Sequence, residues 1–403
     1  MKILDCRPPL FFLTGLVWLI LSSLLGLGLL FGMVLATPLP SYFRLLHVHG
    51  ALVGGVAQMI LGAMVTFIPS LLMTGRDRST SHPLLYLAIN AGTIGLLVGF
   101  ATSHSAMIAT AGLVVVVAFL AVIGDGLNQV RSSLVSPPLN LWFYGVAVLV
   151  LLIGIGIGEA MVLGLIESTS RGLARLGHIH LNLLGFVTLT IVGTMHNLFP
   201  TVLNTPLHSP KLARLTFFLM PAGVVGLVVG FMIPSLPVQI GAGVALIAAS
   251  CIYGYNILRT WITAGRPRNI AADHLMAATL FLILAITTGV LVSVNYLWSP
   301  PKVPFGTLHL VAYTHLALIG FVLQTILGAL SHLLPITFAV QRVPNNKKRA
   351  PYLTELTEIM GRWRALEVAT LALGTLGLAV VASLVWQFPL SSFHVKVATW
   401  VTI

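Results

Sequence analysis

Long apolar runs separated by short polar segments make up most of the chain. A run of about 20 apolar residues is long enough for an α-helix to cross the hydrocarbon core of a bilayer. Glycine and proline occur within and between the runs, and membrane helices tolerate both. We predict eleven transmembrane helices, at 10–35, 45–73, 84–103, 106–128, 139–165, 176–203, 212–233, 237–263, 272–297, 307–338 and 365–387. Another apolar run starts near residue 392, and whether it forms a complete twelfth span stays open.

One histidine-containing pattern occurs three times, in the second, sixth and tenth runs. The copies are HVHGALVGGVAQMILGAMVTFIP, HIHLNLLGFVTLTIVGTMHNLFP and YTHLALIGFVLQTILGALSHLLP. Superposition aligns one histidine, two glycines and one proline in each copy, namely His49, His180 and His315; Gly54, Gly185 and Gly320; Gly62, Gly193 and Gly328; and Pro69, Pro200 and Pro335. Histidine inside a membrane segment is rare and usually functional. Its repetition at one helix position is therefore the sharpest functional signal in the sequence.

The spacing of the copies predicts how the chain is organised. They lie four spans apart, which predicts an all-α polytopic membrane protein of about 12 transmembrane helices in three successive four-helix units. We place the units at 1–133, 134–264 and 265–403, within a single transmembrane domain that covers 1–403. Because four is an even number, the units share one orientation. This favours a pseudo-threefold arrangement about an axis along the membrane normal over an inverted repeat.

Composition and charge support the membrane assignment. The chain has 57% hydrophobic and 7% charged residues, whereas a soluble domain carries roughly a quarter charged residues. The net charge of +12 comes from Lys and Arg in short loops, which indicates membrane topology and not nucleic-acid binding. Sixteen of the 21 basic residues fall on the side of the N-terminus, which we therefore predict to be cytoplasmic, in a bacterial inner membrane. Cys6 and Cys251 lie too far apart to indicate a disulfide framework or a thiolate metal site.

The HxH spacing indicates the kind of site. Residues i and i+2 of a helix point about 200° apart, so His47 and His49 face nearly opposite sides of one span. A compact metal site would use i and i+4 instead, whereas HxH can serve two planar cofactors that flank the helix. Haem needs only one or two axial imidazoles. We predict one or two haems b, with copper left open and no catalytic residue identified. The candidate cofactor ligands are His47, His49, His178, His180 and His315, and His309 is a further candidate metal ligand.

Four other polar residues allow more than one interpretation. His196 and His332 lie about 25 Å deeper than the aligned histidines, so they are structural or part of a proton path. His274 lies near a span end and is expected at the membrane interface. Glu159 is expected on the outer side of the membrane, at the level of the aligned histidines, which we call the histidine layer. It could tune a haem, bind a cation, carry protons or lie at the surface.

The motif resembles subunit I of the heme-copper oxidases, especially the C-type (cbb-type) cytochrome c oxidases and the related nitric oxide reductases. In that family one helix carries HVH followed by Gly, Gly-Ala and Pro, at much the spacing of His47, His49, Gly54, Gly62 and Pro69. The resemblance implies twelve helices in a pseudo-threefold arrangement, with cofactors on helices 2, 6 and 10 and haems toward the outer side. It implies respiratory electron transfer, with reduction of oxygen or nitric oxide as the terminal reaction of the family.

The resemblance also implies roles for individual residues. His315 with His47 or His49 would form a bis-histidine pair, and His178 and His180 would serve a second haem or a metal. Expected partners are membrane lipid, other oxidase-like subunits, and an electron donor of the cytochrome c or quinol type. The seventh run, at 212–233, lacks the adjacent histidine pair that binds copper in the family, so enzymatic activity stays open.

Three alternatives remain at this point. One is a protein resembling the NnrS-like haem and copper membrane proteins of nitric oxide metabolism. Another is a transporter whose histidines bind a metal, which imidazole does readily, or relay protons. The third is a structural subunit whose histidines only hydrogen-bond neighbouring helices.

Overall fold

The computed structural model describes residues 7–35, 37–74, 82–295, 297, 312–343, 345–389 and 391–402. Within these ranges the chain forms helices and no strands, and eleven segments are long and apolar enough to cross a membrane. The protein is thus an all-α, polytopic, integral membrane protein, as predicted. The eleven segments are Pro8–Gly32, Tyr42–Leu71, Pro83–Thr102, Ser105–Ser132, Leu139–Val162, Arg171–Leu203, Pro210–Met232, Leu236–Thr263, Ile270–Asn295, Ala312–Arg342 and Arg364–Val385.

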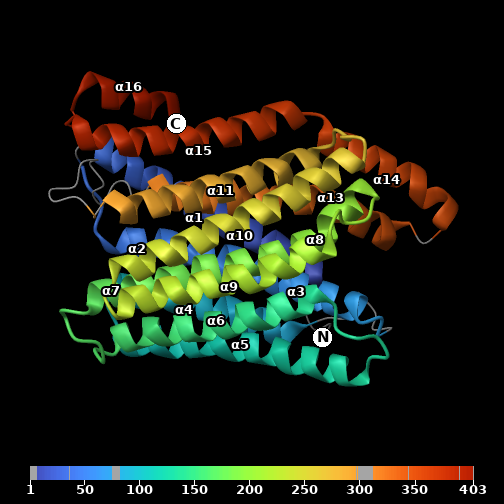
Figure 1. Cartoon of the computed structure of the whole chain (residues 1–403), viewed down its shortest axis with the longest axis horizontal. Helices are drawn as coiled ribbons and strands as arrows, with labels where there is room; N and C mark the ends of the chain where they lie inside the picture. The colour runs from blue at the N-terminus through green and yellow to red at the C-terminus, as the bar shows by residue number, and fades with distance from the viewer. Residues whose placement is uncertain are drawn as a thin grey trace. The chain divides into compact units, whose positions relative to one another are not determined.

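The chain divides into two compact units, Met1–Thr190 and Ile191–Ile403. In unit 1, α1 packs along the rod formed by α2, η1 and α3, while α4 packs on α5 and α5 on α6 (Figure 1). The helices of unit 1 are α1 (Pro8–Val34), α2 (Tyr42–His49), η1 (Gly50–Ala57), α3 (Gln58–Leu71), α4 (Pro83–Thr102), α5 (Ser105–Ser132), α6 (Leu139–Val162), α7 (Arg171–His180) and η2 (Leu181–Thr188).

Unit 2 begins inside α8 (Leu189–Leu203). In this unit α9 packs on α10, α10 on α11, and α11 on the rod of η3 and α13. Its further helices are α9 (Pro210–Met232), α10 (Leu236–Thr263), α11 (Ile270–Asn295), η3 (Leu316–Leu323), α13 (Gln324–Arg342), α14 (Asn346–Gly361), α15 (Arg364–Gln387) and α16 (Phe393–Thr402). The doubtful twelfth run forms the ten-residue α16, which lies back along α15 (Figure 1).

The three motif-bearing spans are the most buried of the eleven. In their apolar stretches 61%, 72% and 56% of the residues are buried, against at most 39% in every other span. The other spans keep many large apolar side chains exposed, as lipid-facing helices do, Leu113 and Leu149 among them. The repeated histidines therefore lie on the inner helices of the fold, where polar membrane residues belong.

The second aligned glycine of the motif lets neighbouring helices approach closely. A Cβ atom at Gly62 would lie 2.8 Å from the Cβ of Phe11 on α1, and one at Gly328 would lie 2.9 Å from Cγ of Leu275 on α11. Both contacts are shorter than a side chain tolerates. α1 and α11 stand at equivalent places, because each begins a predicted four-helix unit. The glycines are thus helix-packing positions of the repeat.

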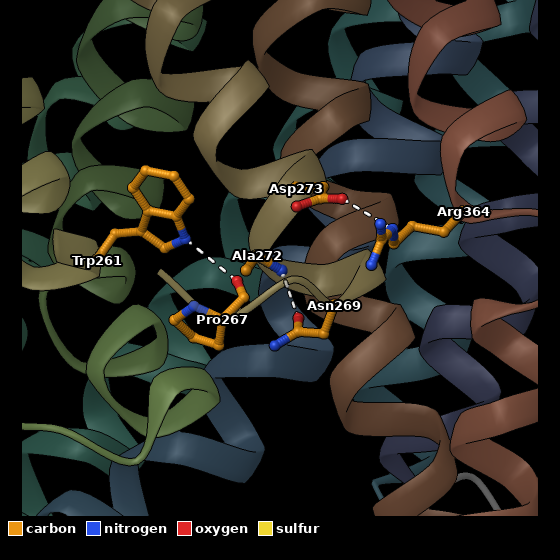
Figure 2. Close-up of polar contacts among 6 residues, drawn as sticks. All are labelled: Trp261, Pro267, Asn269, Ala272, Asp273 and Arg364. Atoms are coloured by element: carbon orange, nitrogen blue, oxygen red, sulfur yellow. Dashed lines mark hydrogen bonds and ion pairs between the residues drawn. The ribbon is translucent and has the colours of Figure 1, made fainter. Parts of the chain in front are cut away.

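Polar contacts at the start of α11 hold one end of unit 2 (Figure 2). The Asn269 side chain accepts a hydrogen bond from the amide of Ala272 (2.8 Å), as an N-cap residue does. The indole of Trp261 donates to the carbonyl of Pro267 in the preceding loop (3.2 Å). Asp273, in the first turn, forms an ion pair with Arg364 at the start of α15 (3.0 Å). These contacts tie the start of α11 to the preceding loop and to α15.

Candidate functional site

A π-helical segment follows the aligned histidine in all three motifs. η1, η2 and η3 each have eight residues, and they begin at the residue after His49, His180 and His315 respectively. π-helical turns are rare and occur often at functional sites. Each widened segment contains the first aligned glycine of the motif at its fifth position. The repeat seen in the sequence is therefore also a repeat of an unusual backbone conformation.

The first histidine of each HxH pair is held by the helix that precedes it. Nδ1 of His47 lies 2.6 Å from the carbonyl oxygen of Ser22 on α1, and Nδ1 of His178 lies 2.8 Å from that of Gly154 on α6. A glycine four residues further along the same helix makes room for each ring. A Cβ at Gly26 would lie 2.7 Å from Cε1 of His47, and one at Gly158 would lie 2.8 Å from Cε1 of His178.

The second histidine of each pair is held by its own helix. Nδ1 of His49 lies 3.0 Å from the carbonyl oxygen of Leu45, and Nδ1 of His180 lies 2.8 Å from that of Leu176, four residues earlier in each case. A carbonyl oxygen can only accept, so Nδ1 must carry the proton. In the neutral imidazole the lone pair then resides on Nε2. This is the tautomer that second-shell carbonyls select in metal-binding histidines.

The structure brings together His49 and His178 within unit 1. Their ring centres are 6.5 Å apart, with 29° between the ring planes. Phe100 of α4 packs against His49, with ring centres 4.5 Å apart. His47 faces α1 while His49 faces α4 and His178. The expectation that HxH serves two different sides of the helix is therefore confirmed on span 2.

The third motif differs at its first position. Tyr313 replaces the first histidine and is 4% exposed. A Cβ at Gly289 of α11 would lie 3.1 Å from its ring, so Tyr313 packs on its preceding helix as His47 and His178 do. His315 lies in unit 2, and its pairing with His47 or His49 stays a prediction. His309 lies outside the described residues.

Two buried glutamines were not recognised in the sequence analysis. Gln58 and Gln324, each fully buried, occupy the ninth position after the aligned histidine in the first and third motifs. The side-chain oxygen of Gln324 bonds Nδ1 of His274 on α11, and the side-chain amide of Gln58 donates to the Phe11 carbonyl (3.4 Å). His274 is only 1% exposed, so its ring lies inside the protein and not on its surface. The shared position of the two glutamines was the available signal.

His196, predicted to be structural or part of a proton path, lies buried in α8. Its ring packs edge-to-face against the ring of Tyr253 on α10, with ring centres 5.6 Å apart.

Among the described residues no three or more His, Cys, Asp or Glu side chains form a group that could hold a metal ion. The candidate centre of unit 1 is thus a pair of imidazoles.

No model of a known protein family matches the chain, and no curated protein matches it either.

Proposed function

We propose that the protein is a haem b-binding integral membrane protein of respiratory electron transfer, in which His49 and His178 would hold one haem. The observation that carries the proposal is the approach of these two rings, each with Nδ1 on a backbone carbonyl. In this arrangement both side chains offer Nε2 as the metal-binding nitrogen.

The separation of the rings supports this assignment. Two imidazoles that bind one metal ion through bonds of roughly 2 Å have ring centres about 6 Å apart, and the observed value is 6.5 Å. A haem supplies four nitrogen ligands of its own and takes one or two from the protein. An imidazole pair therefore suffices for haem, whereas a tetrahedral site made by protein alone needs three or four ligands.

The surrounding residues would hold the ligands in place. Backbone carbonyls of Leu45 and Gly154 fix the tautomer and the ring direction of His49 and His178. Gly54 does not make room for a macrocycle, because Trp18 of α1 and Thr93 of α4 already fill the space beside it. When bound, a haem would supply one-electron chemistry. Within unit 1, His47 and His180 are the candidate ligands for a second haem, and a role for His315 stays a prediction.

Orientation and partners follow from the sequence. The excess of Lys and Arg near the N-terminus and even-numbered loops favours a cytoplasmic N-terminus in a bacterial inner membrane. This direction puts the histidine layer in the outer half of the bilayer. A quinol or a cytochrome c-type protein would then supply electrons. Copper binding and reduction of oxygen or nitric oxide stay predictions of the family resemblance.

Difference spectroscopy tests the proposal. The protein, purified in detergent from a haem-replete host, should show reduced-minus-oxidised bands of haem b. His49→Ala and His178→Ala should each remove the bands or convert the spectrum to that of a haem with one ligand. His394→Ala is the matched control, because His394 is exposed on α16, and its spectrum should equal that of the wild type.

Two results would overturn the assignment. One is wild-type protein without haem, and stoichiometric copper or zinc in such a sample would favour a metal-handling protein. The other is an unchanged haem spectrum in both His49→Ala and His178→Ala, which would move the ligands elsewhere.

A further inference from the structure

Glu159 is an acidic side chain in the last turn of α6. Its Oε2 atom is buried and has no hydrogen-bond partner. The other carboxyl oxygen lies against Gly112 of α5, so closely that a Cβ atom at Gly112 would collide with it. The carboxyl group therefore occupies the space that the absent side chain of Gly112 leaves on α5.

The carboxyl borders a groove between α5 and α6. The groove has a volume of about 500 Å³, and Leu113, Val116 and Leu120 of α5 line it together with Leu152 and Ile155 of α6. Leu113 is 60% exposed and Leu120 is 47% exposed on the outside of this helix pair. The groove thus opens toward the lipid, and Glu159 is its only acidic or basic lining residue.

The surroundings of Glu159 disfavour a negative charge. An ionised carboxylate without hydrogen bonds is costly in apolar surroundings, and the carbonyl end of a helix repels anions. The groove-lining residues of α5 carry no charge. On α7, His178 contacts Gly158 and donates to a carbonyl, while Arg171 and Arg175 are exposed and form no ion pair with Glu159. Within the part of the chain that the structure describes, no Lys or Arg therefore forms an ion pair that offsets the charge.

We infer that Glu159 is a proton-binding site, which holds a proton at neutral pH at the edge of the lipid-facing groove. The site does not suit a metal cation, because a hard cation such as Ca²⁺ requires several oxygen ligands. The groove adds only the hydroxyl group of Thr110, which donates its proton to the Ala106 carbonyl (2.8 Å). The site is built from α5 and α6 alone and does not depend on the haem proposed above.

A lipid-soluble carbodiimide tests this directly. Dicyclohexylcarbodiimide reacts with a protonated carboxyl group, which adds across one C=N bond to give an O-acylisourea that rearranges to a stable N-acylurea. In the full chain in native membranes, peptide mass spectrometry should find the adduct on Glu159, and labelling should fall as the pH rises. Glu167 is the matched control, since it is exposed in the next loop and should stay unlabelled at neutral pH.

Substitutions separate the site from the general fold. Glu159→Gln should abolish the adduct, whereas Glu167→Gln should not change it. Gly112→Ala should displace the carboxyl from its seat and reduce labelling several-fold. Gly124→Ala on the same helix should have no effect, because its Cβ would meet nothing within 4 Å.

The inference is wrong if Glu159 in folded wild-type protein takes up no carbodiimide between mildly acidic and neutral pH. It is also wrong if Glu159 reacts no faster than Glu167 does. Haem spectra of the same samples distinguish this failure from failure of the proposed function, since loss of labelling leaves the histidine pair intact.

Discussion

At the scale of single residues, backbone carbonyls decide which nitrogen of each imidazole can bind a ligand. His47, His49, His178 and His180 all place Nδ1 on a carbonyl oxygen, two on a preceding helix and two on their own. Each ring is thereby oriented before any ligand arrives. This preorganisation lowers the free-energy cost of ligand binding. We expect the carbonyl groups that orient the rings to affect cofactor affinity almost as strongly as the histidines themselves.

The glycine beside His178 gives a first prediction. Gly158→Ala places a methyl group 2.8 Å from the His178 ring, so the ring must shift away from the Gly154 carbonyl. We expect roughly a 10–100-fold loss of haem affinity, measured as the haem-to-protein ratio during titration. Gly156→Ala on the same helix meets nothing within 4 Å and should bind haem normally. Equal affinity in the two variants would contradict the packing argument.

The two buried glutamines give a second prediction, because one substitution should act differently at equivalent positions. Gln324→Leu strands the buried Nδ1–H of His274 and should lower the free energy of unfolding by about 1–3 kcal/mol. Gln58→Leu removes only a long bond to the Phe11 carbonyl and strands no histidine. Its effect should stay within about 1 kcal/mol. Thermal unfolding in detergent compares them, and a larger loss in Gln58→Leu would refute the contrast.

The sequence predicted part of the residue-scale site. Helix geometry sufficed for the divergence of His47 and His49. It could not show that the rings of His49 and His178 approach each other, because these residues lie on helices far apart in the sequence. The contact between His274 and Gln324 was likewise missed, because it joins two helices through residues 50 positions apart in the sequence.

At the scale of elements, the three π-helical segments are the feature that sequence periodicity could not reveal. The motifs carry no insertion relative to one another, so their alignment contains no gap that marks the extra residue. A widened turn at the same place in each copy reorients the histidines relative to the rest of the helix. The glycine-rich composition of η1 agrees with such a turn but does not require it.

Removal of one residue from η1 gives a third prediction. Deletion of Leu52 should allow a regular α-helix and rotate His49 by about 100° relative to α3. We expect loss of most of the bound haem with little change in helix content, measured by absorbance and circular dichroism. Deletion of Ser168, in the exposed loop after α6, is the control and should retain haem. Full haem content after the Leu52 deletion would show that the π-helical turn does not position the ligand.

At the scale of the molecule, the length of the apolar runs predicted all eleven transmembrane spans. Each of the eleven observed segments overlaps its predicted range, because about 20 apolar residues and a bilayer leave few alternatives to a helix. The predicted units at 1–133, 134–264 and 265–403 rest on the sequence repeat, whereas the structure divides into two compact units within α8. The pseudo-threefold arrangement stays a prediction.

Membrane orientation gives the fourth prediction. In a chain with Cys6 and Cys251 replaced by serine, a cysteine at Ser168 should react with a membrane-impermeant maleimide in intact cells. A cysteine at Glu355, exposed on α14, should react only after the cells are opened. This pattern follows from the excess of basic residues on the cytoplasmic side. The reverse pattern would place the histidine layer in the inner half of the bilayer.

The shared position of the three eight-residue π-helical segments also bears on the history of the chain. If each motif had gained its extra residue independently, three separate insertions at the same motif position would be required. One gain in an ancestral gene segment, followed by duplication, requires one event. The shared position of the widened turn therefore favours one origin of the three motifs by duplication.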